Sequence, residues 1–339
     1  MSNKFITTIA ASFIALLPAS AQQVETLPQQ NLAKWHISPA NYSGITRIDS
    51  SLYAVVDDKS SVEGFVLLSI DVDPQTGKIR QVTDKGTCHP ARPDSLSFRA
   101  DCEDLVYVPS SRTVFVAQEN TGQVKEYTMQ GELTGRALRI PESMSRAKQQ
   151  WNGFEALAYH QPSQTFWLTT ENSLKADAPA DSKSRQLLRL NAFSSSLDSL
   201  CQRLYMMEAP RLKQGVKYYT HGVPAMTALP DGRLLVMERE LSVPRRYLGG
   251  KCLIRIFVVD PAEAVQPGAV LTKREVAQFS THIRIGSINY ANYEGMCLGP
   301  QLADGRQTLL LVNDSQAGAG NAICKLKDYL KTIILPHNF

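Results

Sequence analysis

A short motif that recurs along the chain constrains its fold more than any other feature. The best copy runs from Asn152 to Tyr159, with Glu155 just before an apolar stretch, and continues through a turn into a second stretch that ends in Glu171 and Asn172. Weaker copies begin at Asn41, Asp101, His221 and Asn292. Hairpins repeated at intervals of roughly 50 to 70 residues are typical of a β-propeller.

The apolar runs group into five sets of four short strands. The first set comprises residues 45–48, 52–56, 66–72 and 79–83, and the last comprises 294–298, 308–312, 322–326 and 331–335. Runs such as Leu234–Met237 are continuously apolar, the pattern of strands buried on both faces, whereas two β-sandwiches would show cleaner alternation. We therefore predict an all-β fold, a single β-propeller with five four-stranded blades. A sixth blade from Tyr247–Ala277 is the alternative count.

The first residues have the pattern of a signal peptide. Lys4 precedes an apolar stretch, Phe5–Leu17, that is too short to span a bilayer, and Pro18–Ala21 supplies small residues for cleavage. We expect residues 1–21 to be removed and the chain to be periplasmic or secreted, and no later stretch reaches transmembrane length. Residues 22–40 are expected to form a tether with a closing strand at 32–37, beside 333–335. Residues 41–339 are then the propeller domain, whose ring the terminal strands close.

The net charge bears on which partners the chain can bind, and the number of cysteines bears on its disulfides. The formal net charge is only +4 and the charges are well mixed, which argues against a nucleic-acid partner; we expect a monomer. All six cysteines lie in the exported part, and an even number there favours disulfides. Fifteen pairings remain open, and one or two buried free thiols are the alternative. Pairing in sequence order would keep each bridge within one repeat: Cys88–Cys102, Cys201–Cys252 and Cys297–Cys324.

Acidic residues recur at two equivalent positions of the motif, the start of the first strand and the end of the second. Because these strands are antiparallel, the two positions meet on one face, and the carboxylates of different blades should gather at one mouth of the central channel. Such a ring suits Ca²⁺, which takes six to eight oxygen ligands. The expected metal ligands are Glu103, Asp104, Glu119, Glu171 and Asp314. Calcium is accordingly the expected cofactor.

The same ring could supply general acids and bases, since neighbouring carboxylates push their pKa values apart. The candidate catalytic residues are Glu155, Glu238 and Glu294, and Arg239 and His221 are candidate substrate-binding residues because a guanidinium suits phosphate. The alternatives are structural: acids that accept backbone N–H bonds, and an Arg239 paired with a neighbouring blade. The sequence contains no G-x-S-x-G elbow and no histidine pair at metal-ligand spacing.

Three runs carry a resemblance to a known family. Asn152–Ala158, Leu234–Arg239 and Asn292–Met296 resemble the N-x-G-x-E-G-L-A, L-L-V-L-E-R and N-F-E-G-L signatures of phytase-like propeller proteins, exported proteins described as having esterase-like activity of phytase. The sequence departs from them with Ala156 in place of a usual Gly and Ala225 in place of Glu. The resemblance spans residues 42–335 and implies a β-propeller related to the calcium-dependent phytases, with phosphoester hydrolysis.

Two functions are compatible with these features, and the sequence leaves open whether the chain is an enzyme. The first is metal-assisted hydrolysis of a small phosphoester, or another ester, at the acidic mouth. The second is a non-catalytic propeller that recognises a glycan, a peptide or an envelope partner through the same mouth. Fold does not decide between them, because propellers host both.

Overall fold

The computed structural model describes residues 24–60, 62–91, 101–142, 144, 153–263, 266, 268–320, 324–337 and 339. The predicted signal peptide, residues 1–21, lies outside these ranges, as does Asn152 of the repeated motif. Within them, no helix is both long and apolar enough to cross a membrane.

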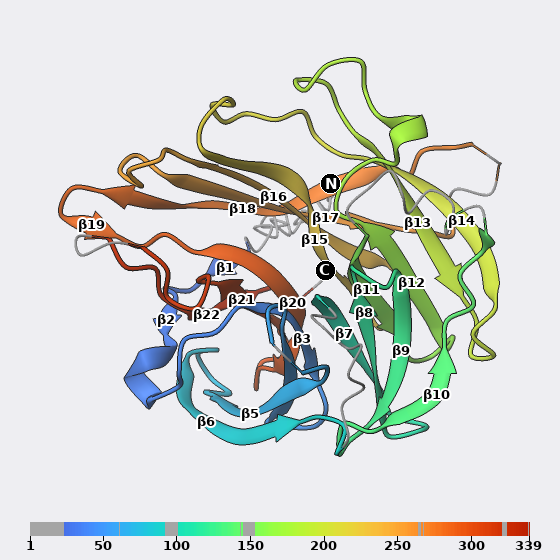
Figure 1. Ribbon diagram of the computed structural model, residues 1–339. Helices are drawn as coiled ribbons and strands as arrows, with labels where there is room; N and C mark the ends of the chain where they lie inside the picture. The colour runs from blue at the N-terminus through green and yellow to red at the C-terminus, as the bar shows by residue number, and fades with distance from the viewer. Residues whose placement is uncertain are drawn as a thin grey trace, which may run out of the picture.

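Five antiparallel sheets surround a central axis and form a β-propeller (Figure 1). Blade 1 contains β3 (Tyr42–Arg47), β4 (Leu52–Asp57), β5 (Phe65–Val72) and β6 (Ile79–Cys88); blade 2 contains β7 (Cys102–Val108), β8 (Thr113–Gln118), β9 (Gln123–Thr128) and β10 (Leu133–Ala137); blade 3 contains β11 (Phe154–His160), β12 (Thr165–Thr170), β13 (Leu187–Phe193) and β14 (Ser199–Met206). Blade 4 contains β15 (Tyr218–Ala228), β16 (Leu234–Val243), β17 (Lys251–Val259), β18 (Lys273–Arg284) and β19 (Ser287–Ile288), and blade 5 contains β20 (Asn292–Gln301), β21 (Gln307–Asp314) and β22 (Tyr329–Ile334). The first strand of each blade contacts that of the next, from β3 round to β20 and back. The prediction of five blades is confirmed.

The terminal strands close the ring, although not with the residues expected. The N-terminal strands β1 (Glu25–Thr26) and β2 (Gln30–Asn31) both pair antiparallel with β22 and complete blade 5 from outside. The expected closing strand at 32–37 is wrong, because Leu32–Trp35 forms the 3₁₀ helix η1, capped by the Asn31 side chain. The segment 322–326, predicted to be the third strand of blade 5, does not take that position. Residues 324–326 contain only an isolated bridge from Lys325 to Gly320, residues 322 and 323 lie outside the described residues, and β22 pairs with β21 instead.

An apolar core fills each interface between neighbouring blades. Phe115 of blade 2 and Phe166 of blade 3 stack with ring centroids 4.7 Å apart, and Met237 of blade 4 packs with Met296 of blade 5. Every residue of β8, β16 and β22 is buried. This two-sided burial explains the continuously apolar runs in the sequence. The alternative of a sixth blade is wrong, because residues 247–277 supply β17 and the beginning of β18, both strands of blade 4.

No disulfide joins any two of the six cysteines, so the predicted disulfides are not formed. Cys201 packs at the interface of blades 3 and 4 while Cys252 lies in the core of blades 4 and 5. Cys297 and Cys324 are likewise in different cores. Sequence order therefore does not bring these pairs together. Burial raises the pKa of Cys102 and of Cys252 to about 12, which keeps both thiols protonated and unreactive.

Candidate functional site

A β-bulge interrupts the first strand of every blade at the same level. Three of the bulges insert one acidic residue each: Glu103 in β7, Glu155 in β11 and Glu294 in β20 have no partner in the register that their neighbours keep with the second strand. The equivalent bulges of β3 and β15 fall between Tyr42 and Ile45 and between Gly222 and Ala225. A bulge re-aims a side chain, so the inserted glutamates are directed differently from their strand neighbours.

Glycines let the acid that ends one blade's second strand approach the first strand of the next blade. A Cβ on Gly153 would lie 2.4 Å from the Cγ of Glu119, and one on Gly222 would lie 2.3 Å from the Cγ of Glu171. Backbone bonds fix this approach, as Val223 N–H donates to the Glu171 carbonyl at 2.9 Å. The carboxylates of neighbouring blades are thereby held close together at one mouth.

Arg239 is the counter-ion for one side of this mouth. Its guanidinium contacts the carboxylates of Glu171 and Glu294, and donates to the side-chain oxygen of Asn292 at 3.1 Å. One buried guanidinium cannot neutralise all the acids around it. Burial, opposed by Arg239, raises the pKa of Glu294 to about 8, and burial with the charges of Glu103 and Glu171 raises the pKa of Glu155 well above its usual range.

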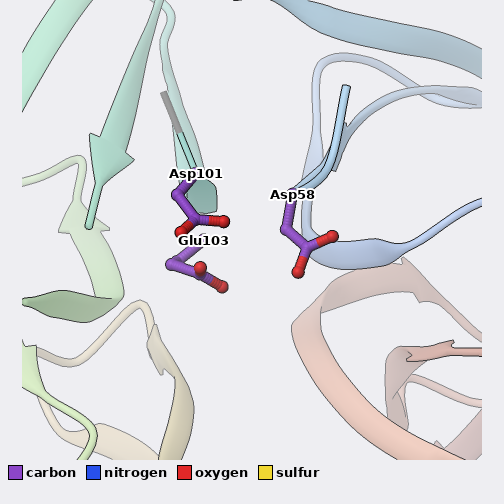
Figure 2. Close-up of side chains that lie close together, drawn as sticks. All are labelled: Asp58, Asp101 and Glu103. Carbon is purple, nitrogen blue, oxygen red and sulfur yellow. The ribbon is translucent and has the colours of Figure 1, made fainter. Parts of the chain in front are cut away.

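The other side of the mouth carries a cluster of three carboxylates. Asp58 follows β4, whereas Asp101 and Glu103 lie at the start of β7, and Figure 2 shows Asp58 facing the other two across the gap between the blades. One oxygen from each lies within 4.8 Å of the others. Asp58 Oδ2 accepts a hydrogen bond from Lys59 at 2.6 Å, but the buried Oδ1 has no partner. Burial raises the pKa of Asp58 to about 6.

Two further predicted ligands lie at the same mouth. Burial, helped by the charge of Asp101, raises the pKa of Glu119 to about 7. Burial also raises the pKa of Asp314, although the Gln316 backbone and side chain donate to its carboxylate. The bulged glutamates and the acids of the cluster therefore form one electrostatically coupled group. The cations that face it among the described residues are Arg239 and Lys59.

Asp104 does not join this group, which corrects its expected role as a metal ligand. The bulge turns it away from Glu103, and its carboxylate accepts backbone N–H bonds from Leu105 and from Leu157 of the next blade, both at 2.8 Å. It is 1% exposed. Asp104 therefore joins blade 2 to blade 3 by accepting backbone hydrogen bonds, which is the structural role that the sequence allowed as the alternative for these acids.

Glu238, expected to be catalytic, is also placed elsewhere. It precedes Arg239 in β16 and lies on the opposite side of the strand, where it accepts hydrogen bonds from Tyr205 and Lys273, both at 2.7 Å, and lies 3.4 Å from Arg255. Its carboxylate also accepts from the Glu208 backbone. This is a buried ion-pair network, not part of the mouth.

Glu238→Gln is therefore expected to destabilise the fold rather than abolish activity. Removing one member of a buried charge network leaves the buried Arg255 without its carboxylate and Lys273 with Glu208 alone, which costs about 3 kcal/mol. Urea unfolding should show a lower midpoint with an unchanged slope, while folded protein keeps its kcat for any ester that the wild type hydrolyses. A variant of normal stability with kcat lowered more than tenfold would restore Glu238 to the catalytic set.

His221, a predicted substrate-binding residue, is buried beside the mouth. Its Nε2 has no hydrogen-bond partner, and burial lowers its pKa, so the ring is neutral. It contributes to a polar pocket of about 450 Å³ over blades 3 and 4, together with Asn172, Tyr219 and Thr220. Thr220 and Asn172 both donate to the Glu171 carboxylate, so this pocket adjoins the acidic mouth.

The sequence places Asp58 among the acids that end the second strands, but it is not in the predicted ligand set, and Asp101 and Lys59 are not either. Asp101 is the first residue of its copy of the motif, just before β7, and its φ of 50° places it in a left-handed conformation that no strand pattern reveals. Asp58 and Lys59 follow β4 in the faintest copy of the motif. The position of Asp58 after the second strand, equivalent to that of Glu119, is the signal that puts it in the ligand set and Lys59 beside it.

The chain was compared with protein families, with curated proteins and with solved structures. The phytase-like family, described as "esterase-like activity of phytase", matches residues 40–316. No curated protein matches the chain. Among solved structures, a thermostable family-43 glycoside hydrolase is 10% identical, with 88% of this chain and 89% of that chain covered and a TM-score of 0.47. A streptogramin B lyase structure is 11% identical, with 92% and 98% covered and a TM-score of 0.39.

Similarities to solved structures at this level carry no information about activity or ligands. The family match is different, because it covers most of the chain, including all five bulges and every acid of the mouth. The motifs that suggested the same family from sequence, around Glu155, Arg239 and Glu294, are the ones that build this mouth. The chain belongs to the phytase-like family described as esterase-like activity of phytase.

Proposed function

We propose that this protein is an exported, metal-assisted hydrolase of phosphoesters or related esters that acts at the acidic mouth. The cluster of Asp58, Asp101 and Glu103 carries the proposal. It joins three carboxylates from two blades, Asp58 faces the other two acids, and its buried Oδ1 has no hydrogen-bond partner. A buried carboxylate oxygen without a partner is costly unless something else satisfies it.

The donor set fits Ca²⁺. Calcium binds carboxylate oxygens at about 2.4 Å, so oxygens that lie within 4.8 Å of one another can share one ion. Asp58, Asp101 and Glu103 would hold it, with Glu119 and Asp314 close enough electrostatically to add negative charge. The hard oxygen donors and the absence of histidine or thiol from the cluster favour Ca²⁺ over zinc. When bound, the ion supplies Lewis-acid polarisation of a substrate oxygen.

The chain's own residues would do the remaining work. The raised pKa of Glu155 favours its protonated form, which makes it the group suited to protonate a leaving oxygen. Arg239 fixes Glu171 and Glu294 in place. Both of its terminal nitrogens are occupied and its Nε is buried, so we assign it a positioning role. The amine of Lys59, half-exposed beside Asp58, is the cation at the mouth that a phosphate oxygen can reach.

Calcium is expected to stabilise the purified chain and to support ester hydrolysis. A ligand that binds only the folded state at 100 times its Kd adds about 2.7 kcal/mol to the free energy of unfolding, so thermal unfolding with calcium and with chelator should differ by several degrees. Release of p-nitrophenol from phosphate and acyl esters then tests turnover. If calcium stabilises the chain but no ester is hydrolysed, the protein is a non-catalytic binding propeller. If calcium does not change the unfolding temperature, the proposed metal site is wrong.

A further inference from the structure

Blade 4 carries an exposed basic edge that the proposed function does not use. Its strands β15 and β18, with 11 and 12 residues, are longer than any strand of the other blades, and β18 runs out to the edge of the molecule at β19 (Figure 1). Three segments meet there, residues 213–219, 243–251 and 282–288. Together they contain six lysines and arginines and no aspartate or glutamate. For a chain with a net charge of only +4, this is a marked local concentration of positive charge.

The three segments are held together by specific contacts. Ile283 and the 249–250 turn exchange backbone hydrogen bonds of 2.8 and 2.9 Å, and Tyr218 pairs with Val243 across β15 and β16. The rings of Tyr218 and Tyr247 lie 6.1 Å apart. The residues of this edge therefore form one continuous surface, although they are up to about 70 positions apart in sequence.

The cations of this edge have no acidic partners among the described residues. Lys217, Arg245, Arg246 and Arg284 are exposed and form no ion pair there, whereas Lys273 and Arg255 of the same blade are paired with Glu238. Burial, with the charges of Arg284 and Lys251, lowers the pKa of His282 between them. Cations left unpaired beside one another repel, and an anionic partner relieves that repulsion.

Large apolar side chains stand among these cations. Ile285 occupies the tip of the turn between β18 and β19 and is 89% exposed, Leu248 is 52% exposed and Tyr218 is 45% exposed. Exposed aliphatic tips beside a tyrosine and several Lys and Arg residues are the features by which peripheral proteins insert into the interface of an anionic bilayer. A soluble polyanion would use the cations but would gain little from Ile285 and Leu248.

We propose that this edge, defined by Lys217, Tyr218, Arg245, Arg246, Leu248, Arg284 and Ile285, is a docking surface for an anionic lipid bilayer. The cations contact lipid phosphates and the apolar tips enter the boundary between headgroups and acyl chains. This proposal is independent of the calcium site, because the two share no residue.

Co-flotation of the purified chain with vesicles tests the proposal. The chain should float with phosphatidylcholine vesicles that contain phosphatidylglycerol, should not float with phosphatidylcholine alone, and should be released by salt. Replacing Arg245, Arg246 and Arg284 by Ser should weaken binding on the order of 100-fold, at roughly fivefold per cation. Ile285→Ser with Leu248→Ser should weaken it at least tenfold.

Matched controls lie on other blades. Lys78 and Lys85 of blade 1 are exposed cations and Leu200 of blade 3 is 58% exposed, so their Ser variants remove the same kinds of group at unrelated places. These variants should bind vesicles like the wild type, and all variants should keep the wild-type unfolding temperature. Equal binding to neutral vesicles, or no binding to anionic ones, would overturn the proposal. Loss with the arginine variant but not with the Ile285 variant, together with retention on heparin, would indicate a soluble polyanion instead.

Discussion

Glu103→Gln is expected to stabilise the ion-free protein while removing its response to calcium. Burial and the charges of Glu294 and Asp58 raise the pKa of Glu103 well above its usual range, so the ionised form is disfavoured in the fold. A neutral amide of the same shape avoids this cost, worth on the order of 1 kcal/mol for each pKa unit by which ionisation is disfavoured. Thermal unfolding in chelator should therefore give a higher Tm for the variant than for the wild type.

The same substitution removes one of three charged donors from the proposed calcium site. Calcium affinity should fall about 100-fold or more, and any calcium-dependent hydrolysis should fall with it. The order of stability should consequently reverse between chelator and calcium, with the wild type more stable only when the ion is present. A general packing defect would lower the Tm of the variant in both conditions, so it would not reverse the order of stability.

Glu126→Gln is a matched control. Glu126 is as buried as the mouth acids, but its carboxylate is satisfied by Arg136 at 3.1 Å and by Thr113 and Thr134, both at 2.7 Å. Its replacement should lower the Tm by a similar amount with and without calcium. If Glu103→Gln behaves in the same way as Glu126→Gln, the acids at the mouth are structural and the metal site is wrong.

The architecture was predictable because its determinants are local and repeated. Five copies of one hairpin motif predicted five blades, and the structure contains five. Closure of the ring by the terminal strands was predicted, but the N-terminal residues that close it were not. Strands β1 and β2 have two residues each, too short for any periodicity, and their partner β22 lies some 300 positions away.

The site was predictable as a ring of acids but not residue by residue. Glu103 and Asp104 are adjacent, and a bulge of one residue decides which of them reaches the mouth. Glu238 and Arg239 pose the same problem, because every residue of β16 is buried and no alternation of polar and apolar residues identifies the side facing the channel. Bulge position depends on how blades pack, which composition and spacing do not encode.

Arg239→Met is expected to be the most destabilising change at the mouth. Arg239 is 3% exposed and contacts Glu171 and Glu294, so its removal leaves buried carboxylates without a counter-ion. Breaking one buried ion pair in this way costs about 3–5 kcal/mol. The surface variant Arg306→Met, which loses an exposed partner in Asp304, should cost about 0–1 kcal/mol and serves as the control.

The cost of Arg239→Met should depend on pH in a defined direction. The pKa of Glu294 is raised to about 8 in the fold, so the folded state binds more protons than the unfolded state between about pH 4.5 and pH 8. Stability from this group is fully present below the unfolded pKa and is lost as the pH rises through about 8. Without Arg239 the pKa rises further, so urea unfolding should show a larger loss of stability near pH 8 than near pH 5.

Neutralising the stranded acids should rescue the variant. The triple variant Arg239→Met, Glu171→Gln and Glu294→Gln replaces a buried ion network by uncharged groups of similar volume, an exchange that is often neutral for stability. Its unfolding midpoint should return most of the way to that of the wild type and lose its excess pH dependence. Failure of this rescue, with Arg239→Met equally unstable near pH 5 and pH 8, would mean that Arg239 acts through packing and is not the counter-ion of the mouth.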